Sequence, residues 1–320
     1  MTWLLSRIDL TARLLIAAIV LAIVLPAHGQ GRDVAQAVSN AAIFVLFFLN
    51  GVRLSRAEVW RGLASWRLLV PLALWCFGAM ALAGLGLEQL ARGVLPPLVA
   101  LGFLYLGVLP STVQSATAYS SLAHGNVALS VVAAALLNIA GIFLSAPILA
   151  LLEGRGAVAA DMSGLIRIAS ILLLPFVLGQ LLQRPIVPLV RERAGMFAWM
   201  DRTAIAIAVY VAFSGAVMQR FWEALDLSGW LVLFGLVGAF LLFAFAGSWW
   251  LGGALTKIRE DRISFLFAGA HKSIAMGAPL ALVIFSPAEA GQVLVPVLLY
   301  HLVQLLISAP VATRLAASRP

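Results

Sequence analysis

Apolar segments long enough to cross a lipid bilayer follow one another along almost the whole of this sequence. A spanning helix needs about 20 apolar residues, and Arg, Gly and Pro punctuate the chain at roughly that spacing. Backbone polar groups in lipid need partners within their own segment, which favours helices. We therefore predict an all-α membrane protein, residues 1–320 forming a single membrane domain. Its ten helices are expected at 10–28, 37–53, 66–87, 95–122, 126–151, 164–184, 202–222, 228–255, 263–285 and 289–314.

Composition leaves little material for a folded part outside the lipid bilayer. Of the 320 residues, 63% are hydrophobic and 11% are charged, whereas soluble domains average about 25% charged residues. The net charge of +8 does not indicate a nucleic-acid partner, because the basic residues lie in short clusters between apolar segments. The single cysteine, Cys76, excludes an intrachain disulfide and a cysteine-rich metal site.

The distribution of Lys and Arg predicts the orientation of the chain. With the N-terminus in the cytoplasm, 15 basic residues fall on the cytoplasmic side and 5 on the other side. Positive charge is enriched in cytoplasmic loops, so we expect a multi-pass protein of the bacterial inner membrane with both termini cytoplasmic. Residues 1–26 resemble a signal peptide, but no clean cleavage site follows, and we expect this first helix to be retained.

Two of the ten segments contain residues that interrupt a helix. In the fourth segment, Pro110 is followed by a run of hydroxyl and amide side chains. In the ninth segment, Gly269 and Pro279 lie on either side of Lys272. We therefore predict that helices 4 and 9 are broken and that they cross near the bilayer midplane.

The positions of the two interruptions predict an internal repeat. Pro110 and Ala270 are 160 residues apart, which is half the chain length. Interrupted segments at matching positions in two halves are typical of transporters built from inverted repeats. An odd number of five spans in the first half inverts the second half in the membrane relative to the first. We therefore predict two inverted five-helix repeats, residues 1–160 and 161–320.

Lys272 is the only charged residue that we expect at membrane depth, since all 13 acidic residues fall in predicted loops or at predicted helix ends. Such a charge costs about 2.5–3.5 kcal/mol on insertion scales, which makes it a functional candidate. Two functional roles fit. The ammonium can occupy the place of a coupling cation, or it can pair with an anionic substrate beside helix N-termini. A structural lysine that tethers carbonyl groups or extends to the membrane interface is the alternative.

Other polar side chains in and near the interruptions are candidates for binding substrate or ion. Their alternative roles are to satisfy backbone groups freed by a helix break or to join helices. Asn50 and Asn138 are expected to be buried amides, and His301 and Gln304 share a helical face. No metal-ligand spacing accompanies the histidines. The candidates from the residues alone are His271, Ser273, Thr112, Gln114, Ser115, Thr117, Asn50, Asn138, His301 and Gln304.

Three stretches are similar to motifs of a known family. LPSTVQSATAYSSLAHGNVALS (109–130) ends in HGNVALS, which resembles RGDVALS or RGNVP, and FFLNGVRLS (47–55) supports it. AGAHKSIAMGAP (268–279) is similar to a SKKSLASG-type motif. On these motifs the chain resembles the bile acid:sodium symporter family, in the branch of sodium/bile acid cotransporter 7 and its bacterial relatives. The resemblance implies a core domain of helices 3–5 and 8–10 and a panel domain of helices 1, 2, 6 and 7, with substrate bound between them.

The resemblance also carries over single residues. It places Ser130 at a sodium-site serine, and Thr117 or Ala116 at a sodium-site asparagine. Ala134 replaces a liganding threonine, and His301 matches a histidine near the substrate cavity.

The sodium motif of the ninth helix is not retained. Phe267 and His271 stand where the family has glutamate and glutamine, and Lys272 follows directly. The resemblance therefore does not predict the two sodium sites of the family in this chain. Sodium or a proton is the candidate coupling ion, and no other cofactor or metal is expected.

The leading functional hypothesis is a secondary active transporter that carries a small organic anion or an amphipathic, bile-acid-like solute by alternating access. Two alternatives stay open: a sodium- or proton-coupled carrier of a neutral solute, and a membrane regulator that binds a ligand without transporting it. The sequence contains no HExxH motif, no GxSxG motif and no acidic pair at membrane depth, which argues against an enzyme.

Overall fold

The described part of the chain is almost entirely helical. The computed structural model describes residues 10–53, 65–153, 169–220, 223 and 225–318, and no β-strand occurs among them. The helices are α2 (Leu10–Val24), α3 (Gly29–Arg53), α5 (Trp66–Leu74), the π-helix η1 (Trp75–Ala79), α6 (Met80–Ala91), α7 (Pro97–Val108), α8 (Gln114–Leu122), α9 (Val127–Glu153), the π-helix η2 (Ala169–Leu173), α11 (Leu174–Leu181), α12 (Gln183–Glu192), α13 (Ala194–Met218), α14 (Leu227–Leu255), α15 (Arg259–Ala270), α16 (Ile274–Ile284) and α17 (Pro287–Ala317).

Seven helical stretches of the described residues are long and apolar enough to cross a membrane. An eighth is counted if 170–181 and 183–192, which are bent by 91° against each other, form one span. Helices α2 and α7 are apolar but shorter. The all-helical class is confirmed, whereas the number of ten spans stays a prediction.

The structure differs from the predicted helix ranges between α11 and α13. Helix α12 was not predicted, and α13 begins at Ala194 rather than at 202. Asp201 therefore lies inside α13, so the prediction that every acidic residue sits in a loop or at a helix end is wrong. Its carboxylate is buried and accepts a hydrogen bond from the Arg53 guanidinium. Burial is tolerated because the opposite charge and the hydrogen bond compensate for the lost hydration.

Part of the predicted topology falls outside the described residues. This holds for the boundary between the predicted repeats, 160/161. It also holds for six of the arginines used to predict the orientation: Arg7, Arg56, Arg61, Arg155, Arg167 and Arg319.

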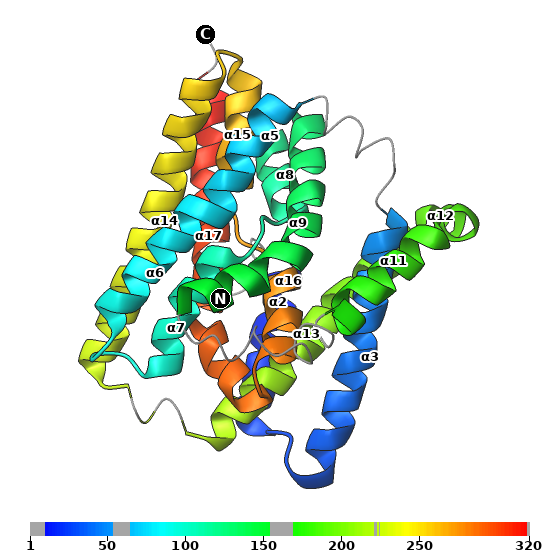
Figure 1. Cartoon of the computed structure of the whole chain (residues 1–320), viewed down its shortest axis with the longest axis vertical. Coiled ribbons are helices and arrows are strands. Elements are labelled where there is room, and N and C mark those ends of the chain that lie inside the picture. The colour runs from blue at the N-terminus through cyan, green and yellow to red at the C-terminus, as the bar shows by residue number, and fades with distance from the viewer. Residues whose placement is uncertain (1–9, 54–64, 154–168, 221–222, 224, 319–320) are drawn as a thin grey trace. The chain divides into compact units, whose positions relative to one another are not determined.

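The chain divides into two compact units. The first comprises residues 1–54, 157–224 and 277–294. Within it α3 packs against α11 and α13, and α13 packs against α2 (Figure 1). Helices α3 and α11 approach so closely that a Cβ atom at Gly51 would collide with the Phe176 carbonyl, and one at Gly179 with the Phe48 carbonyl.

The second unit comprises residues 55–156, 225–276 and 295–320. Within it α6 packs against α7 and α14, and α15 packs against α14, α8 and α9 (Figure 1). Residues 106–126 and 267–276 lie in this unit, so Pro110 and Lys272 belong to one compact body, whereas Pro279 of the ninth segment is grouped with the first unit.

Candidate functional site

The two predicted helix interruptions are present. Helix α7 ends at Val108 and α8 begins at Gln114, while α15 ends at Ala270 and α16 begins at Ile274. The residues that follow α7 and α15 are extended, with φ −72° and ψ 146° at Leu109 and φ −83° and ψ 141° at His271. Pro110 contributes because it has no N–H to continue the helix and pushes the residue before it out of the α region.

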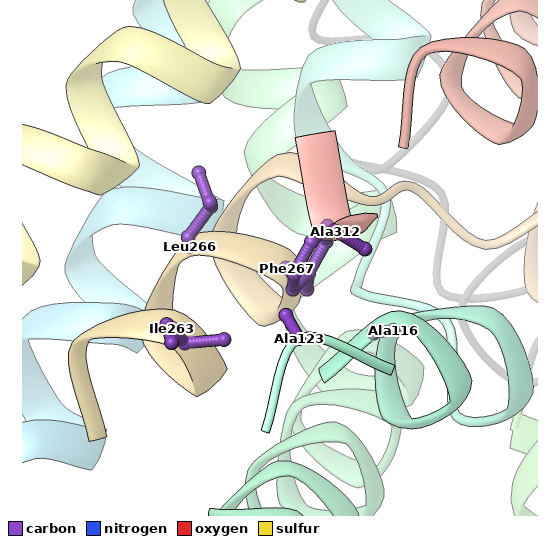
Figure 2. Packing of buried hydrophobic residues seen from close by; sticks show 6 residues of the cluster. All are labelled: Ala116, Ala123, Ile263, Leu266, Phe267 and Ala312. Carbon is purple, nitrogen blue, oxygen red and sulfur yellow. The ribbon is translucent and has the colours of Figure 1, made fainter. Parts of the chain in front are cut away.

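The two interruptions meet. The Ser273 N–H donates to the Pro110 carbonyl at 2.9 Å. A buried apolar cluster packs α8 and α15 against each other and against α17 (Figure 2). The cluster consists of Ala116, Ala123, Ile263, Leu266, Phe267 and Ala312.

The Lys272 ammonium lies at this meeting point and is bound by main-chain carbonyl oxygens. Its Nζ is 2.7 Å from the Leu109 oxygen, 2.8 Å from the Gly107 oxygen and 3.0 Å from the Cys76 oxygen. The side chain is fully buried, with 1% of the residue exposed. An ammonium has three N–H donors, and the three carbonyls use them all.

Two of the three carbonyls are free to accept because they lie at the end of a helix. Gly107 and Leu109 are at the C-terminal end of α7, where carbonyls lack partners within the helix and the helix dipole is negative. Cys76 lies in η1, and single π-turns within helices are frequent at functional sites.

Every carbonyl from 107 to 111 receives a donor from outside its own helix. Besides the two bound by Lys272 and the one bound by the Ser273 N–H, the Val108 oxygen accepts from Ser145 Oγ at 2.8 Å. The Ser111 oxygen accepts from Asn138 Nδ2 at 2.8 Å. The first interruption is therefore held in one conformation by hydrogen bonds from two other segments, 272–273 and α9.

The end of α15 is satisfied in a different way, by side chains of neighbouring helices. The Ala270 oxygen accepts from the Tyr300 hydroxyl at 2.6 Å, and the Gly269 oxygen accepts from Trp75 Nε1 at 3.2 Å. Cys76 Sγ lies 3.8 Å from the Ala268 oxygen. No ammonium is used at this end, so the two interruptions are chemically distinct.

Gln304 of α17 holds the second interruption through the backbone of Lys272. Its Oε1 accepts from the Lys272 N–H at 2.9 Å, and its Nε2 donates to the Lys272 carbonyl at 3.2 Å. Nε2 is also 2.9 Å from His301 Nδ1. His301 and Gln304 thus share a helical face as predicted.

His271 connects both interruptions with α17. Its Nδ1 is 2.9 Å from Ser115 Oγ and 3.4 Å from Thr112 Oγ1, and its Nε2 is 2.7 Å from Ser308 Oγ. The ring is fully buried. Because a neutral imidazole has one donor and one acceptor nitrogen, the hydroxyls on its two sides take complementary roles.

Several predicted site residues have identifiable structural roles. Thr112 Oγ1 accepts from the Ala116 N–H at 3.1 Å, and Ser273 Oγ accepts from the Met276 N–H at 3.2 Å. Both hydroxyls therefore cap the half-helix that follows them.

The remaining candidates differ in their surroundings. Ser130 is buried, and its Oγ lies 3.5 Å from Thr117 Oγ1. Gln114 is exposed at the start of α8, and its side chain makes no hydrogen bond to the described residues. Asn50, expected to be a buried amide, is exposed on α3 and belongs to the first unit, whereas residues 109–113 and 271–273 belong to the second. Its place on the helix, rather than its apolar sequence context, decides its exposure.

The sequence did not reveal the acceptors of the Lys272 ammonium, because every residue has a main-chain carbonyl and the residue types do not show which carbonyls are available. Tyr300 and Ser308 were missed as well. Those two were detectable: Tyr300, Gln304 and Ser308 recur every four residues, which places three polar side chains on one face of an apolar helix.

Comparison with known proteins identifies the family of this chain. The model of the SBF-like CPA transporter family matches residues 11–317. The chain belongs to this family. Its members are transporters rather than enzymes, and with its apolar helices this SBF-like transporter is a multi-pass membrane protein. The similarity to the sodium/bile acid cotransporter 7 branch is confirmed as well.

Three relatives span nearly the same length. PA2026 of Pseudomonas aeruginosa, named an uncharacterized protein, is 37% identical over 95% of this chain and 92% of its own. YfeH of Escherichia coli, named a "putative symporter", is 32% identical over 94% and 90%. Sodium/bile acid cotransporter 7 of Mus musculus is 24% identical over 85% and 81%.

Proposed function

We propose that this SBF-like transporter is a secondary active carrier of an organic anion or an amphipathic, bile-acid-like solute, and that it works by alternating access. The observation that carries the proposal is the meeting of two helix interruptions, joined by the Ser273 N–H and the Pro110 carbonyl. Carriers built from repeats place their substrate at interrupted helices, where backbone and polar side chains are available within an apolar body.

The charges around the interruptions support an anionic solute. Neither 109–113 nor 271–273 contains an acidic residue, and the N-terminal ends of α8 and α16 point their positive dipoles to this region. The relative from Mus musculus is named sodium/bile acid cotransporter 7, and this name supports the solute class. Among the polar side chains at the two interruptions, that of Gln114 is exposed. We assign it a direct contact with the solute.

We also infer the finer architecture. The seven long spans, the bent pair, α2 and the α7–α8 pair together support ten spans, arranged as two inverted repeats. The second unit would supply the core domain and the first the panel domain, with 277–294 grouped with the first. The predicted placement in the bacterial inner membrane with cytoplasmic termini is retained.

Uptake by the purified protein in liposomes tests the function. Labelled taurocholate and a steroid sulfate are offered with an inward sodium gradient, with an inward proton gradient, and with choline in place of both. We expect accumulation of at least one anion above protein-free liposomes. Gln114→Ala should lower uptake at least several-fold at unchanged thermal stability. Gln89→Ala, which alters an exposed amide on α6 of the same unit, should leave uptake unchanged.

The same experiment separates the alternatives. Uptake restricted to uncharged solutes would favour a carrier of a neutral solute. Binding of an anion, measured by thermal stabilisation, without any uptake would favour a membrane regulator. Equal uptake by the native protein and Gln114→Ala would remove Gln114 from the substrate site.

A further inference from the structure

Three main-chain carbonyl oxygens converge on one point within the second unit. The oxygens of Cys76, Gly107 and Leu109 all lie 2.7–3.0 Å from Lys272 Nζ. Carbonyl oxygens at the unwound ends of half-helices are the groups with which carriers bind alkali cations. The arrangement is therefore a cation site by its chemistry, and a lysine ammonium stands in it.

No salt bridge in the described part of the chain pairs the Lys272 ammonium with a carboxylate. A buried charge needs compensation by partners in place of water, and here the carbonyl dipoles and the negative end of α7 supply it. Since all three N–H groups are used, none is left to bind an anionic solute.

The carbonyl groups keep their places through contacts that do not involve the Lys272 side chain. Ser145 Oγ binds the carbonyl between them, that of Val108. The Ser273 N–H binds the next one, that of Pro110. On the other side, Trp75 and Cys76 are tied to Gly269 and Ala268. A site held in this way persists when the ammonium is removed.

We propose that the carbonyl oxygens of Cys76, Gly107 and Leu109 form a monovalent-cation site, which the chain fills with its own Lys272 ammonium in place of a free ion. This goes beyond the proposed function and does not depend on what is transported. It differs from a merely structural lysine in one consequence: the empty site of a Lys272 variant binds a small cation from solution.

Chemical rescue of Lys272→Ala tests the proposal. The substitution leaves Cβ and removes three carbons and the nitrogen, so n-propylammonium replaces the missing atoms. Thermal stability is measured in detergent with the chloride salts of n-propylammonium, sodium, potassium and choline at equal ionic strength. In choline we expect a Tm lower than that of the native protein by roughly 5–10 °C. Propylammonium should restore at least half of the loss, and sodium or potassium part of it.

Two controls make the response specific. Lys257→Ala alters the only other lysine, which is exposed after α14, and its Tm should neither fall nor respond to any of the salts. n-Propanol has the size of n-propylammonium without its charge and should not rescue Lys272→Ala.

The outcomes are unambiguous. No rescue by any cation, equal rescue by propanol, or an equal response of the native protein would overturn the proposal. If Lys272→Ala cannot be purified in choline, it is expressed and extracted with propylammonium throughout. Recovery of folded protein only with the amine supports the site, and equal loss in both salts overturns it. Because uptake is not measured, the result stands whether or not the liposome experiment succeeds.

Discussion

The Ser273 N–H donates a hydrogen bond of 2.9 Å to the carbonyl oxygen of Pro110. This single bond joins the backbones of two interrupted helices that lie far apart in the sequence. Both groups are orphans of their own segments, because neither belongs to a continuous helix. A change that displaces Pro110 is therefore expected to disturb the second interruption as well.

Gly141→Ala should displace Pro110. A Cβ atom at Gly141, in the middle of α9, would lie 2.8 Å from Pro110 Cγ, well inside van der Waals contact. Overpacking of this kind costs about 1–3 kcal/mol, and we expect that loss in denaturant unfolding of the detergent-solubilised protein. Gly238→Ala on α14 meets nothing within 4 Å and should be neutral or stabilising by up to about 1 kcal/mol. Equal stabilities of the two variants would contradict this reading.

Gln304→Met should destabilise the second interruption. Methionine fills a similar volume but leaves the Lys272 N–H and carbonyl without the partners that Gln304 supplies. Leaving buried polar groups unpaired costs about 1–3 kcal/mol each, so a Tm loss of several degrees is expected. Gln292→Met breaks an exposed contact with Gln219 and should stay within about 0.5 kcal/mol of the native protein. A Gln304→Met variant as stable as Gln292→Met would exclude a holding role for Gln304.

Arg53 and Asp201 should be energetically coupled. Arg53→Met leaves a buried carboxylate unpaired, whereas Asp201→Asn retains a polar acceptor, so Arg53→Met should be the more damaging change. A double-mutant cycle on unfolding free energies should give a coupling of about 1–3 kcal/mol. The exposed pair Arg220–Glu223, at 3.5 Å, serves as the comparison and should give less than about 1 kcal/mol. Additive effects at Arg53 and Asp201 would refute the coupling.

Asp226 should contribute stability in a pH-dependent way. It accepts from the Gly229 N–H at the start of α14, and this bond, followed by that from the Ser228 hydroxyl, lowers the pKa of its carboxyl below the usual 3.8. A lowered folded-state pKa means that the contribution is complete above the usual pKa and is lost as the pH falls through the lowered one. The Tm difference between the native protein and Asp226→Ala should therefore shrink on acidification.

Asp226→Asn provides the control for this titration. Asparagine caps helices as well as aspartate does but carries no titrating carboxyl. It should retain most of the Tm at neutral pH. Its advantage over Asp226→Ala should persist at low pH; if it vanishes together with that of Asp226, the carboxyl is not the titrating group.

The interruptions were predictable because their causes are local. Pro110 has no N–H to donate within a helix, and Lys272 and the glycines near it interrupt an apolar segment. Individual residues therefore indicate both breaks. The shared face of His301 and Gln304 follows from helical spacing alone. Each of these predictions needs knowledge of one segment only.

What could not be predicted depends on partners distant in the sequence. Helix α13 includes Asp201, in a stretch that hydropathy assigns to a loop. The Asp201 carboxylate is tolerated there because Arg53 of another helix neutralises its charge. The π-helix η1 contains no residue that demands a wider turn. The Cys76 carbonyl of η1 accepts a hydrogen bond from Lys272, which is distant in the sequence, so the residues around Cys76 do not indicate this contact.

The covalent attachment of the Lys272 nitrogen limits which ion gradients can drive transport through this position. A carrier draws energy from an ionic gradient by taking up an ion on one side and releasing it on the other. A nitrogen fixed by covalent bonds cannot leave its site, so the position bounded by the Cys76, Gly107 and Leu109 oxygens exchanges no sodium or potassium ion between the two sides. A driving metal cation must therefore be bound elsewhere in the chain.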